Sequence, residues 1–295
     1  MLTIKIKYIF NIFTNALRKS FFDTIKHDGI EHAGYLSFLG ILSLFPFLVF
    51  LVSLLGQIGD TELGFEFTNL LLANIPKEVS MALEPRINEI ISGPPQSLLT
   101  IAILGAIWTA SGTVEGLRTI FNRAYRVSTP PSYILRRLTS IAQFILITFL
   151  IITAMFIIIL IPIILERLII FKSVISLYGI LEHALKLRFL FSTIIIFSAV
   201  SFIYYVIPNV KQKLINICPG AILVAVLWSI IGSAFSFYLQ NFDQVNLIYG
   251  SLASLIIALL FFYIIAMILI FGAEFNYAIE KQTGFKFIEK IEQAK

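Results

Sequence analysis

Long apolar stretches, each about the length of a membrane-spanning helix, alternate with shorter polar segments along this chain of 295 residues. A helix needs roughly 20 apolar residues to cross about 30 Å of hydrocarbon. Six stretches approach or exceed this length: 33–58, 96–113, 138–165, 188–207, 217–240 and 249–274. They lack the alternation of barrel strands, and open strands would leave backbone groups unpaired in lipid. We therefore expect an all-α membrane protein, with six transmembrane helices in a single polytopic domain over 1–295.

Composition and charge placement support a membrane location and set the orientation. Only 13% of the residues are charged, against about 25% in a typical soluble domain. Sixteen of the 22 Lys and Arg residues fall in the terminal segments 1–32 and 275–295 and in two loops, 114–137 and 208–216. Basic residues are enriched on the cytoplasmic side of a membrane. The pattern therefore predicts a multi-pass protein with both termini in the cytoplasm, surrounded by the lipid bilayer.

The segment between the first two apolar stretches is amphipathic and too polar to cross a membrane. Residues 61–74 and 76–91 each place apolar side chains at helical spacing, and acidic residues accompany them. We expect an amphipathic helical hairpin over 60–92 on the outer side. It serves either as a cover packed on the bundle or as a lid over a cavity.

Polar residues gather at the predicted cytoplasmic ends of the helices. Ionisable groups at membrane depth are costly, so they normally have partners or line a wet cavity. Glu115 and Arg118, three residues apart on a helix, can form an ion pair. The candidate substrate-binding or gating residues are Ser111, Glu115, Arg118, Asn122, Arg123, Asn209, Lys211, Glu274 and Asn276. The alternative is that these groups only anchor helix ends through salt bridges.

Proline and glycine also interrupt the apolar stretches. Pro46 lies inside the first stretch, where the ring removes a backbone hydrogen bond and favours a helix kink. Broken helices often line transporter sites, although kinks also occur as packing features. Small residues, which let helix backbones approach, lie inside the second and fifth stretches: Gly105, Gly112, Ser229, Gly232 and Ser233. We expect close helix contacts at these residues.

Residue patterns that carry enzyme chemistry are missing from the sequence. The three histidines, His27, His32 and His183, lie outside the apolar stretches, and Cys218 is the single cysteine. The chain has no HExxH, GxSxG or Walker-type sequence. Basic residues do not cluster with aromatic residues as in nucleic-acid-binding proteins. We expect no enzyme activity, no cofactor, no metal site and no nucleic-acid partner.

Seven short segments together resemble the YihY/BrkB family of bacterial inner-membrane proteins, once labelled ribonuclease BN. They span about 25–280 and comprise Ala33–Pro46, Trp108–Gly112, Asn122–Tyr125, Pro208–Lys211, Cys218–Ala221, Ile248–Leu252 and Gly272–Asn276. The resemblance implies a six-helix protein of the bacterial inner (plasma) membrane with no established reaction. Family members have been linked to serum resistance, and roles in transport or envelope lipids have been proposed.

Three functions are compatible with these patterns. The favoured one is a transporter or envelope-lipid-handling protein that acts on a lipid or a small molecule. The alternatives are a non-transporting membrane scaffold and an intramembrane enzyme, although no nucleophile–base pair is recognisable. Ribonuclease activity is not expected, because zinc-dependent nucleases use His/Asp clusters such as HxHxDH and this chain has none.

Overall fold

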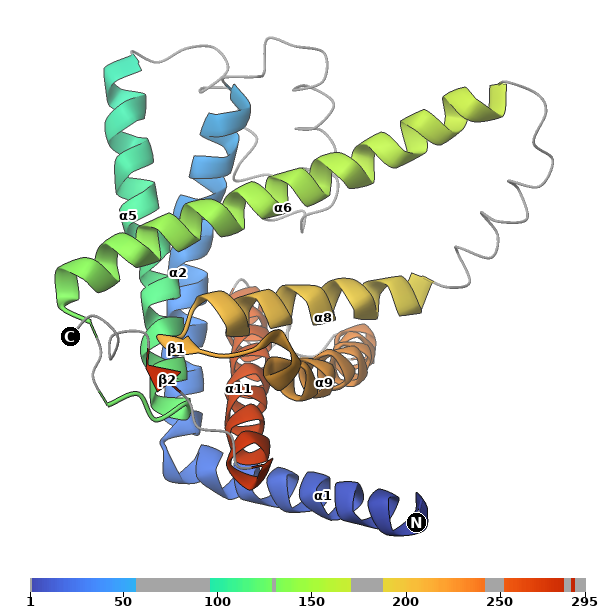
Figure 1. Ribbon diagram of the computed structural model, residues 1–295. Helices are drawn as coiled ribbons and strands as arrows, with labels where there is room; N and C mark the ends of the chain where they lie inside the picture. The colour runs from blue at the N-terminus through green and yellow to red at the C-terminus, as the bar shows by residue number, and fades with distance from the viewer. Residues whose placement is uncertain are drawn as a thin grey trace. The chain divides into compact units, whose positions relative to one another are not determined.

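The computed structural model describes residues 2–56, 96–128, 131–170, 188–241, 252–283 and 288–289, which form seven α-helices and one small sheet (Figure 1). The helices are α1 (Leu2–Lys26), α2 (Gly29–Gly56), α5 (Gln96–Ala124), α6 (Tyr133–Ile170), α8 (Arg188–Val206), α9 (Leu214–Asn241) and α11 (Leu252–Thr283). Strands β1 (Val210–Lys211) and β2 (Ile288–Glu289) pair antiparallel. The helical fold class is confirmed, and the sequence did not indicate the two-residue strands.

Each predicted membrane span overlaps one of these helices. Within the described residues, three stretches are long and apolar enough to cross a membrane: Tyr133–Leu150 in α6, Leu214–Phe235 in α9 and Leu255–Thr283 in α11. Helix α11 runs nine residues beyond the predicted end at position 274. Six crossings and a single domain over 1–295 stay predictions. The predicted hairpin over 60–92 lies outside the described residues.

The contacts of the chain divide it into two compact units, each described by itself. The first unit comprises Met1–Ile41, Thr113–Leu138 and Ala184–Lys295, and the second comprises Leu42–Gly112 and Thr139–His183. In the first unit, buried side chains from α2, α5 and α11 form one apolar core: Ala33, Leu36, Ile120, Ala266 and Ile270. A smaller cluster joins Ala16 of α1 to Phe275 and Ala278 of α11. The first unit therefore has the core that positions its polar residues.

Helices α9 and α11 approach most closely at a pair of glycines in the first unit. A Cβ atom on Gly220 would lie 2.4 Å from the carbonyl oxygen of Gly272, and a Cβ on Gly272 would lie 2.4 Å from the Tyr204 hydroxyl. No larger residue fits at either position without displacing its neighbours. The hydroxyl of Tyr204 on α8 donates a hydrogen bond of 2.6 Å to the carbonyl oxygen of Leu269 on α11. Three helices are thus joined at one buried level.

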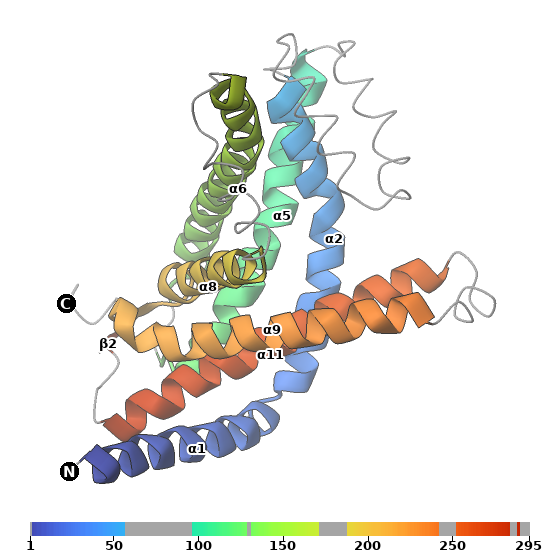
Figure 2. The same cartoon turned by 90° about the vertical axis from the view of Figure 1, so that its right-hand side faces the viewer.

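A tight turn connects α1 to α2 and sets the position of the end of α1. Asp28 adopts a left-handed conformation with φ of 57°, which aspartate tolerates better than most residues. Gly29 follows, and a Cβ atom there would lie 2.6 Å from the carbonyl oxygen of Thr24. Figure 2 shows α1 running beside the end of α11, in agreement with their many contacts. The turn therefore places His27 next to α11.

The close helix contacts expected at Gly105 and Gly232 are wrong. Among the described residues, no atom lies within 4 Å of a Cβ built on either glycine. Gly232 lies three turns of α9 beyond the Gly220 crossing, where it lines an apolar pocket together with Trp228 and Phe235. Small residues therefore mark close packing at one level of α9 and open space at another.

The second unit contains the predicted proline and one well-defined aromatic contact. Pro46 lies inside α2, and the helix continues on both sides of it. The rings of Phe47 and Phe144 meet edge to face at 6.1 Å, which joins α2 to α6. Proline at this position is thus accommodated within a helix that packs on its neighbour.

Candidate functional site

The central feature of the first unit is a buried ion pair between Glu274 and Arg126. Nη1 of Arg126 lies 3.0 Å from Oε1 of Glu274, and Nη2 lies 2.9 Å from Oε2. This is the two-pronged geometry that gives an arginine–carboxylate pair its strength. The Glu274 side chain is 2% exposed and the Arg126 side chain 27%. Glu274 lies on α11 within a candidate membrane span, so its charge is balanced at the place where water is scarce.

Arg126 reaches this position because of the way in which α5 ends. The amide of Val127 bonds the carbonyl of Asn122 at 2.8 Å, and the amide of Arg126 bonds that of Arg123 at 3.1 Å. These two bonds form a Schellman cap, whose left-handed residue is usually glycine. Here that residue is Arg126, with φ of 59°, a conformation that costs about 1–2 kcal/mol. The strained backbone directs the guanidinium back toward the helix end.

The guanidinium of Arg126 also contacts several groups besides Glu274. Nη1 also donates to the carbonyl oxygens of Ala124 and Arg123 at 2.7 and 2.8 Å. These carbonyls belong to the last turn of α5, whose partial negative charge favours a cation. The guanidinium carbon lies 4.7 Å from the ring centre of Tyr277, a cation–π contact. One arginine therefore caps α5 and holds α11.

Helix α1 and the turn after it supply two further groups to this ion pair. Nδ1 of His27 lies 3.0 Å from Nη2 of Arg126 and 3.2 Å from Oε1 of Glu274. A neutral Nδ1 accepts a hydrogen bond from Arg126, whereas a protonated one donates to Glu274. Asp23 lies near the same guanidinium, with 3.6 Å between its Oδ2 and Nη2 of Arg126. We call Asp23, His27, Arg126 and Glu274 the Glu274 cluster.

A second set of buried contacts is made by amide side chains. Asn122 accepts a hydrogen bond of 2.8 Å from the backbone amide of Asn209 and donates one of 3.3 Å to its side chain. Asn276 accepts from the backbone amide of Gly220 at 2.7 Å and donates to the Tyr125 hydroxyl at 3.3 Å. Burial raises the pKa of the Tyr125 hydroxyl well above its usual range, so the group stays neutral. The amides connect α5, α9 and α11 without net charge.

The predicted pair between Glu115 and Arg118 is confirmed, with 3.6 Å between Nε and Oε2. Arg136 shares the carboxylate, with 3.4 Å between its Nε and Oε1 of Glu115. The Arg118 side chain is 2% exposed, and burial lowers its pKa. Glu115 and Glu274 are thus balanced by different arginines rather than forming one shared site.

The remaining predicted site residues are outside the ion pairs of the Glu274 cluster, although Arg123 borders the small hollow next to Glu274. Arg123 forms an ion pair of 2.5 Å with Asp28, and both side chains are about half exposed. Lys211 is exposed on β1. Ser111 belongs to the second unit, where its hydroxyl donates to the carbonyl of Trp108 at 3.0 Å. Of the predicted residues, only Glu274 therefore belongs to the Glu274 cluster.

Sequence reasoning did not select Asp23, His27, Arg126 or a further buried carboxylate, Glu280. The Glu280 residue is 5% exposed. Its Oε1 accepts from Asn216 at 3.2 Å, and its Oε2 has no hydrogen-bond partner among the described residues. A signal for Glu280 was present, because the apolar spacing of α11 continues through Ala278 and Ile279. The other three depend on the turns that follow α1 and α5.

The space next to Glu274 is very small. A hollow of about 10 Å³ is bordered by His27, Arg123 and Glu274, among others, which is the size of about one water molecule. In the part of the chain that the structure describes, no three His, Cys, Asp or Glu residues gather as metal ligands. The arrangement therefore offers charge pairing close to a single water-sized space.

Comparison with known proteins identifies the family. A family model described as "Virulence factor BrkB" matches residues 21–295. The chain belongs to this family. Within the BrkB family, the "Putative ribonuclease-like protein YfkH" of Bacillus subtilis (strain 168) is 28% identical over 259 residues, covering 87% of this chain and 92% of the relative. The family resemblance drawn from the sequence is thus confirmed.

Other BrkB-family relatives carry a membrane-protein name. The "UPF0761 membrane protein VV0203" of Vibrio vulnificus (strain YJ016) is 25% identical over 92% of this chain and 84% of its own length. The "UPF0761 membrane protein PsycPRwf_0630" of Psychrobacter sp. (strain PRwf-1) is 24% identical over 93% of this chain, which spans 50% of that relative. No solved structure matches. Together with the apolar helices, these relatives make the chain a membrane protein of the BrkB family.

Proposed function

We propose that this BrkB-family protein moves or holds a lipid within the membrane, and that the Glu274 cluster is its closed cytoplasmic gate. The observation that carries the proposal is the buried ion pair of Glu274 and Arg126 on a candidate membrane span. Ionisable residues within membrane helices usually mark a pathway or a relay. The proposed topology has six spans, with both termini in the cytoplasm and the bacterial inner membrane as location.

A buried ion pair adds little to the stability of a fold. Removing two charges from water costs about as much as their attraction returns, and well-packed apolar residues often do better. Arg126 additionally sits in a strained backbone conformation. A strained backbone at the partner of a buried carboxylate favours a role in switching.

The cluster contains the groups for a second arrangement. Arg126 lies between two carboxylates, with Nη2 at 2.9 Å from Glu274 and 3.6 Å from Asp23. If Arg126 transfers to Asp23, Glu274 loses its cation. A protonated His27 then donates from Nδ1 to Glu274, only 3.2 Å away, and histidine is the side chain that charges most readily near neutral pH. Opening the gate would therefore replace Arg126 with His27 as the partner of Glu274, so that the carboxylate is not left unpaired.

A second candidate function is a non-transporting membrane scaffold. Its support is that both oxygens of Glu274 are paired and that the adjoining hollow has room for about one water. A scaffold would keep the cluster closed permanently. The two functions differ in whether Glu274 must ever lose Arg126.

We also propose that the protein is not a ribonuclease, despite the ribonuclease-like name of the relative from Bacillus subtilis. The basis is the sequence, whose three histidines do not form an HxHxDH pattern. Purified protein incubated with RNA and zinc or magnesium ions should release no fragments beyond those of a mock purification. Cleavage that co-purifies with the protein and disappears in a point variant would contradict this.

The test measures lipid movement in reconstituted vesicles of phosphatidylethanolamine and phosphatidylglycerol. The probe is a phosphatidylethanolamine with a fluorescent headgroup that dithionite bleaches only in the outer leaflet. Wild-type protein should accelerate movement between leaflets, and Glu274→Gln, which removes the carboxylate that holds Arg126 in the closed gate, should raise the rate at least about tenfold, equivalent to about 1.4 kcal/mol in activation free energy. The control is Glu31→Gln, an exposed carboxylate in the first turn of α2.

The outcomes separate the two candidate functions. A Glu274→Gln variant that moves lipid at the wild-type rate would remove the cluster as a gate. A wild-type protein that moves lipid no faster than empty vesicles, while folded, would favour the scaffold. The same change of rate in Glu31→Gln would be a general effect of charge removal and would also contradict the proposal.

A further inference from the structure

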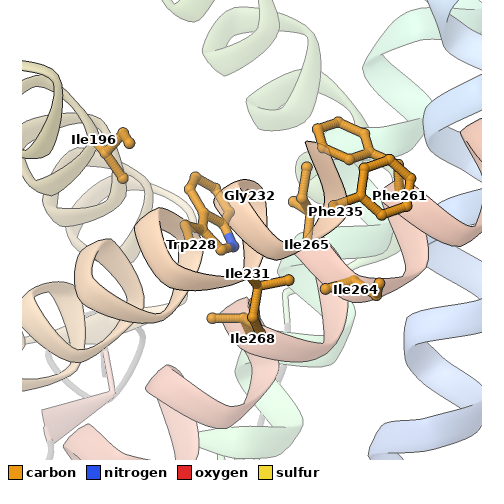
Figure 3. Close-up of a pocket in the computed structure, with 9 residues that line it drawn as sticks. All are labelled: Ile196, Trp228, Ile231, Gly232, Phe235, Phe261, Ile264, Ile265 and Ile268. Atoms are coloured by element: carbon orange, nitrogen blue, oxygen red, sulfur yellow. The ribbon is translucent and has the colours of Figure 1, made fainter. Parts of the chain in front are cut away.

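An apolar pocket lies among α8, α9 and α11, separate from the Glu274 cluster. Its volume is about 200 Å³. Figure 3 shows the nine lining residues, which include Ile196 of α8, Trp228, Gly232 and Phe235 of α9, and Phe261 and Ile268 of α11. An engineered cavity of about 150 Å³ is known to bind benzene. The pocket therefore has room for a segment of a hydrocarbon chain and not for a whole lipid.

The pocket forms because α9 and α11 separate beyond their glycine crossing. At Gly220 and Gly272 the backbones are so close that a Cβ atom would collide. At Gly232, twelve residues further along α9, a Cβ atom would meet nothing within 4 Å among the described residues. The rings of Phe235 and Phe261 meet at 5.4 Å and join the two helices again. The opening is thus bounded at both ends.

The surroundings of the pocket indicate which molecules can reach it. Apolar stretches of α9 and α11 that could cross a membrane border it. Large apolar side chains next to it in sequence are exposed, including Ile195, Ile230 and Phe237. In a membrane protein, such exposed faces contact lipid chains. The pocket is therefore supplied from the hydrocarbon of the bilayer.

One polar atom in this apolar wall needs a partner. The indole N–H of Trp228 is buried and has no hydrogen-bond partner among the described residues. A buried tryptophan N–H usually finds an acceptor, because leaving it unpaired is unfavourable. A plain hydrocarbon cannot accept a hydrogen bond, whereas the carbonyl oxygen of an ester can. The fitting occupant is a hydrocarbon chain that carries such an oxygen.

We propose that this pocket binds one acyl chain of a membrane phospholipid, whose ester carbonyl accepts a hydrogen bond from the Trp228 indole. This rests on the proposed lipid-handling function and gives it a substrate class.

The experiment uses the intrinsic fluorescence of Trp228. The chain has two tryptophans, so Trp108→Phe in the second unit leaves Trp228 as the single reporter. Lipid-stripped full-length protein in detergent is titrated with phosphatidylglycerol that carries brominated acyl chains, which quench tryptophan on contact. Quenching should saturate at one lipid per chain.

Two glycine variants make the test specific. Gly232→Leu places a side chain into the pocket without a clash and should weaken the apparent affinity at least about tenfold. Gly105→Leu is the matched control, because Gly105 is equally open but lies on α5 in the second unit. Its titration should match that of the parent protein. Native mass spectrometry of Trp228→Phe should show several-fold weaker lipid retention than the wild type.

Other outcomes would overturn the proposal. Quenching that rises without saturation, or that is unchanged in Gly232→Leu, would mean contact with bulk lipid only. A change of oligomeric mass in Gly232→Leu, with no saturable lipid binding in the parent, would assign the pocket to a second copy of the chain. Saturable quenching together with no lipid movement in vesicles would refute the proposed function but keep the site. If Glu274→Gln changes lipid movement as expected but quenching does not saturate, the proposed function is kept and the pocket is refuted as a lipid site.

Discussion

Two regions that share helix α11 differ in polarity and in the open space beside them. The Glu274 cluster is polar, its charges are paired, and it adjoins a hollow of about 10 Å³. The apolar pocket that Trp228 lines measures about 200 Å³ and contains a donor without a partner among the described residues. On α11 only six residues, about 9 Å of helix, separate Ile268 in the pocket from Glu274. The comparison shows that the charged groups are paired while the apolar space on the same helix is open, an arrangement compatible with the proposed lipid-handling function.

The largest expected effect on stability comes from removing Arg126 from the Glu274 cluster. Arg126→Ala leaves the buried carboxylate of Glu274 without its cation, so we expect a loss of about 3 kcal/mol in the free energy of unfolding, the lower end for a broken buried pair. Arg123→Ala is the matched control, since its pair with Asp28 is about half exposed and is worth about 0–1 kcal/mol. Denaturant unfolding of both variants in detergent measures the difference. Equal losses would show that the cluster is no more than a surface salt bridge.

A second prediction compares Gly220 and Gly232, two glycines of α9 with different surroundings. Gly220→Ala forces a Cβ atom against the Gly272 carbonyl, and such overpacking costs about 1–3 kcal/mol. Gly232→Ala meets open space and removes a flexible glycine from a helix, which should stabilise by about 0.5–1 kcal/mol. Thermal unfolding should therefore shift in opposite directions. Shifts of the same sign would contradict the divergence of α9 from α11.

A smaller effect is expected where the amide contacts meet α5. Tyr125→Phe removes the acceptor of the Asn276 side chain and should cost about 1 kcal/mol, because a buried amide donor is left unpaired. Tyr133→Phe, at an exposed tyrosine, serves as the control and should be neutral. Chemical denaturation distinguishes them. A neutral Tyr125→Phe would mean that the amide contacts add little to the junction of α5 and α11.

Much of the helical framework could be predicted from apolar stretches alone. The pair of Glu115 and Arg118 follows from their spacing of three residues on one helix, and the structure contains it. Glu274 and Asn276 stand out because they interrupt an apolar stretch. These features are local, so the sequence carries them directly.

The partners of Glu274 could not be predicted in the same way. Arg126 reaches Glu274 because a non-glycine residue adopts φ of 59° at the end of α5, and nothing in the local sequence requires that. His27 reaches it through the turn at Asp28 and Gly29. Gly232 and Gly272 look alike in sequence, and only the separation of the neighbouring helix distinguishes them. Non-local packing therefore decides the site, whereas local patterns decide the helices.

The most direct test of the gate is Asp23→Asn. This change removes the second carboxylate that Arg126 can bind and leaves the pair with Glu274 intact. If the cluster switches partners, Arg126 stays on Glu274, and lipid movement in vesicles should fall by about tenfold while stability changes by less than about 1 kcal/mol. Lipid movement at the wild-type rate in Asp23→Asn would contradict the partner exchange and leave the Glu274 cluster as a permanent lock.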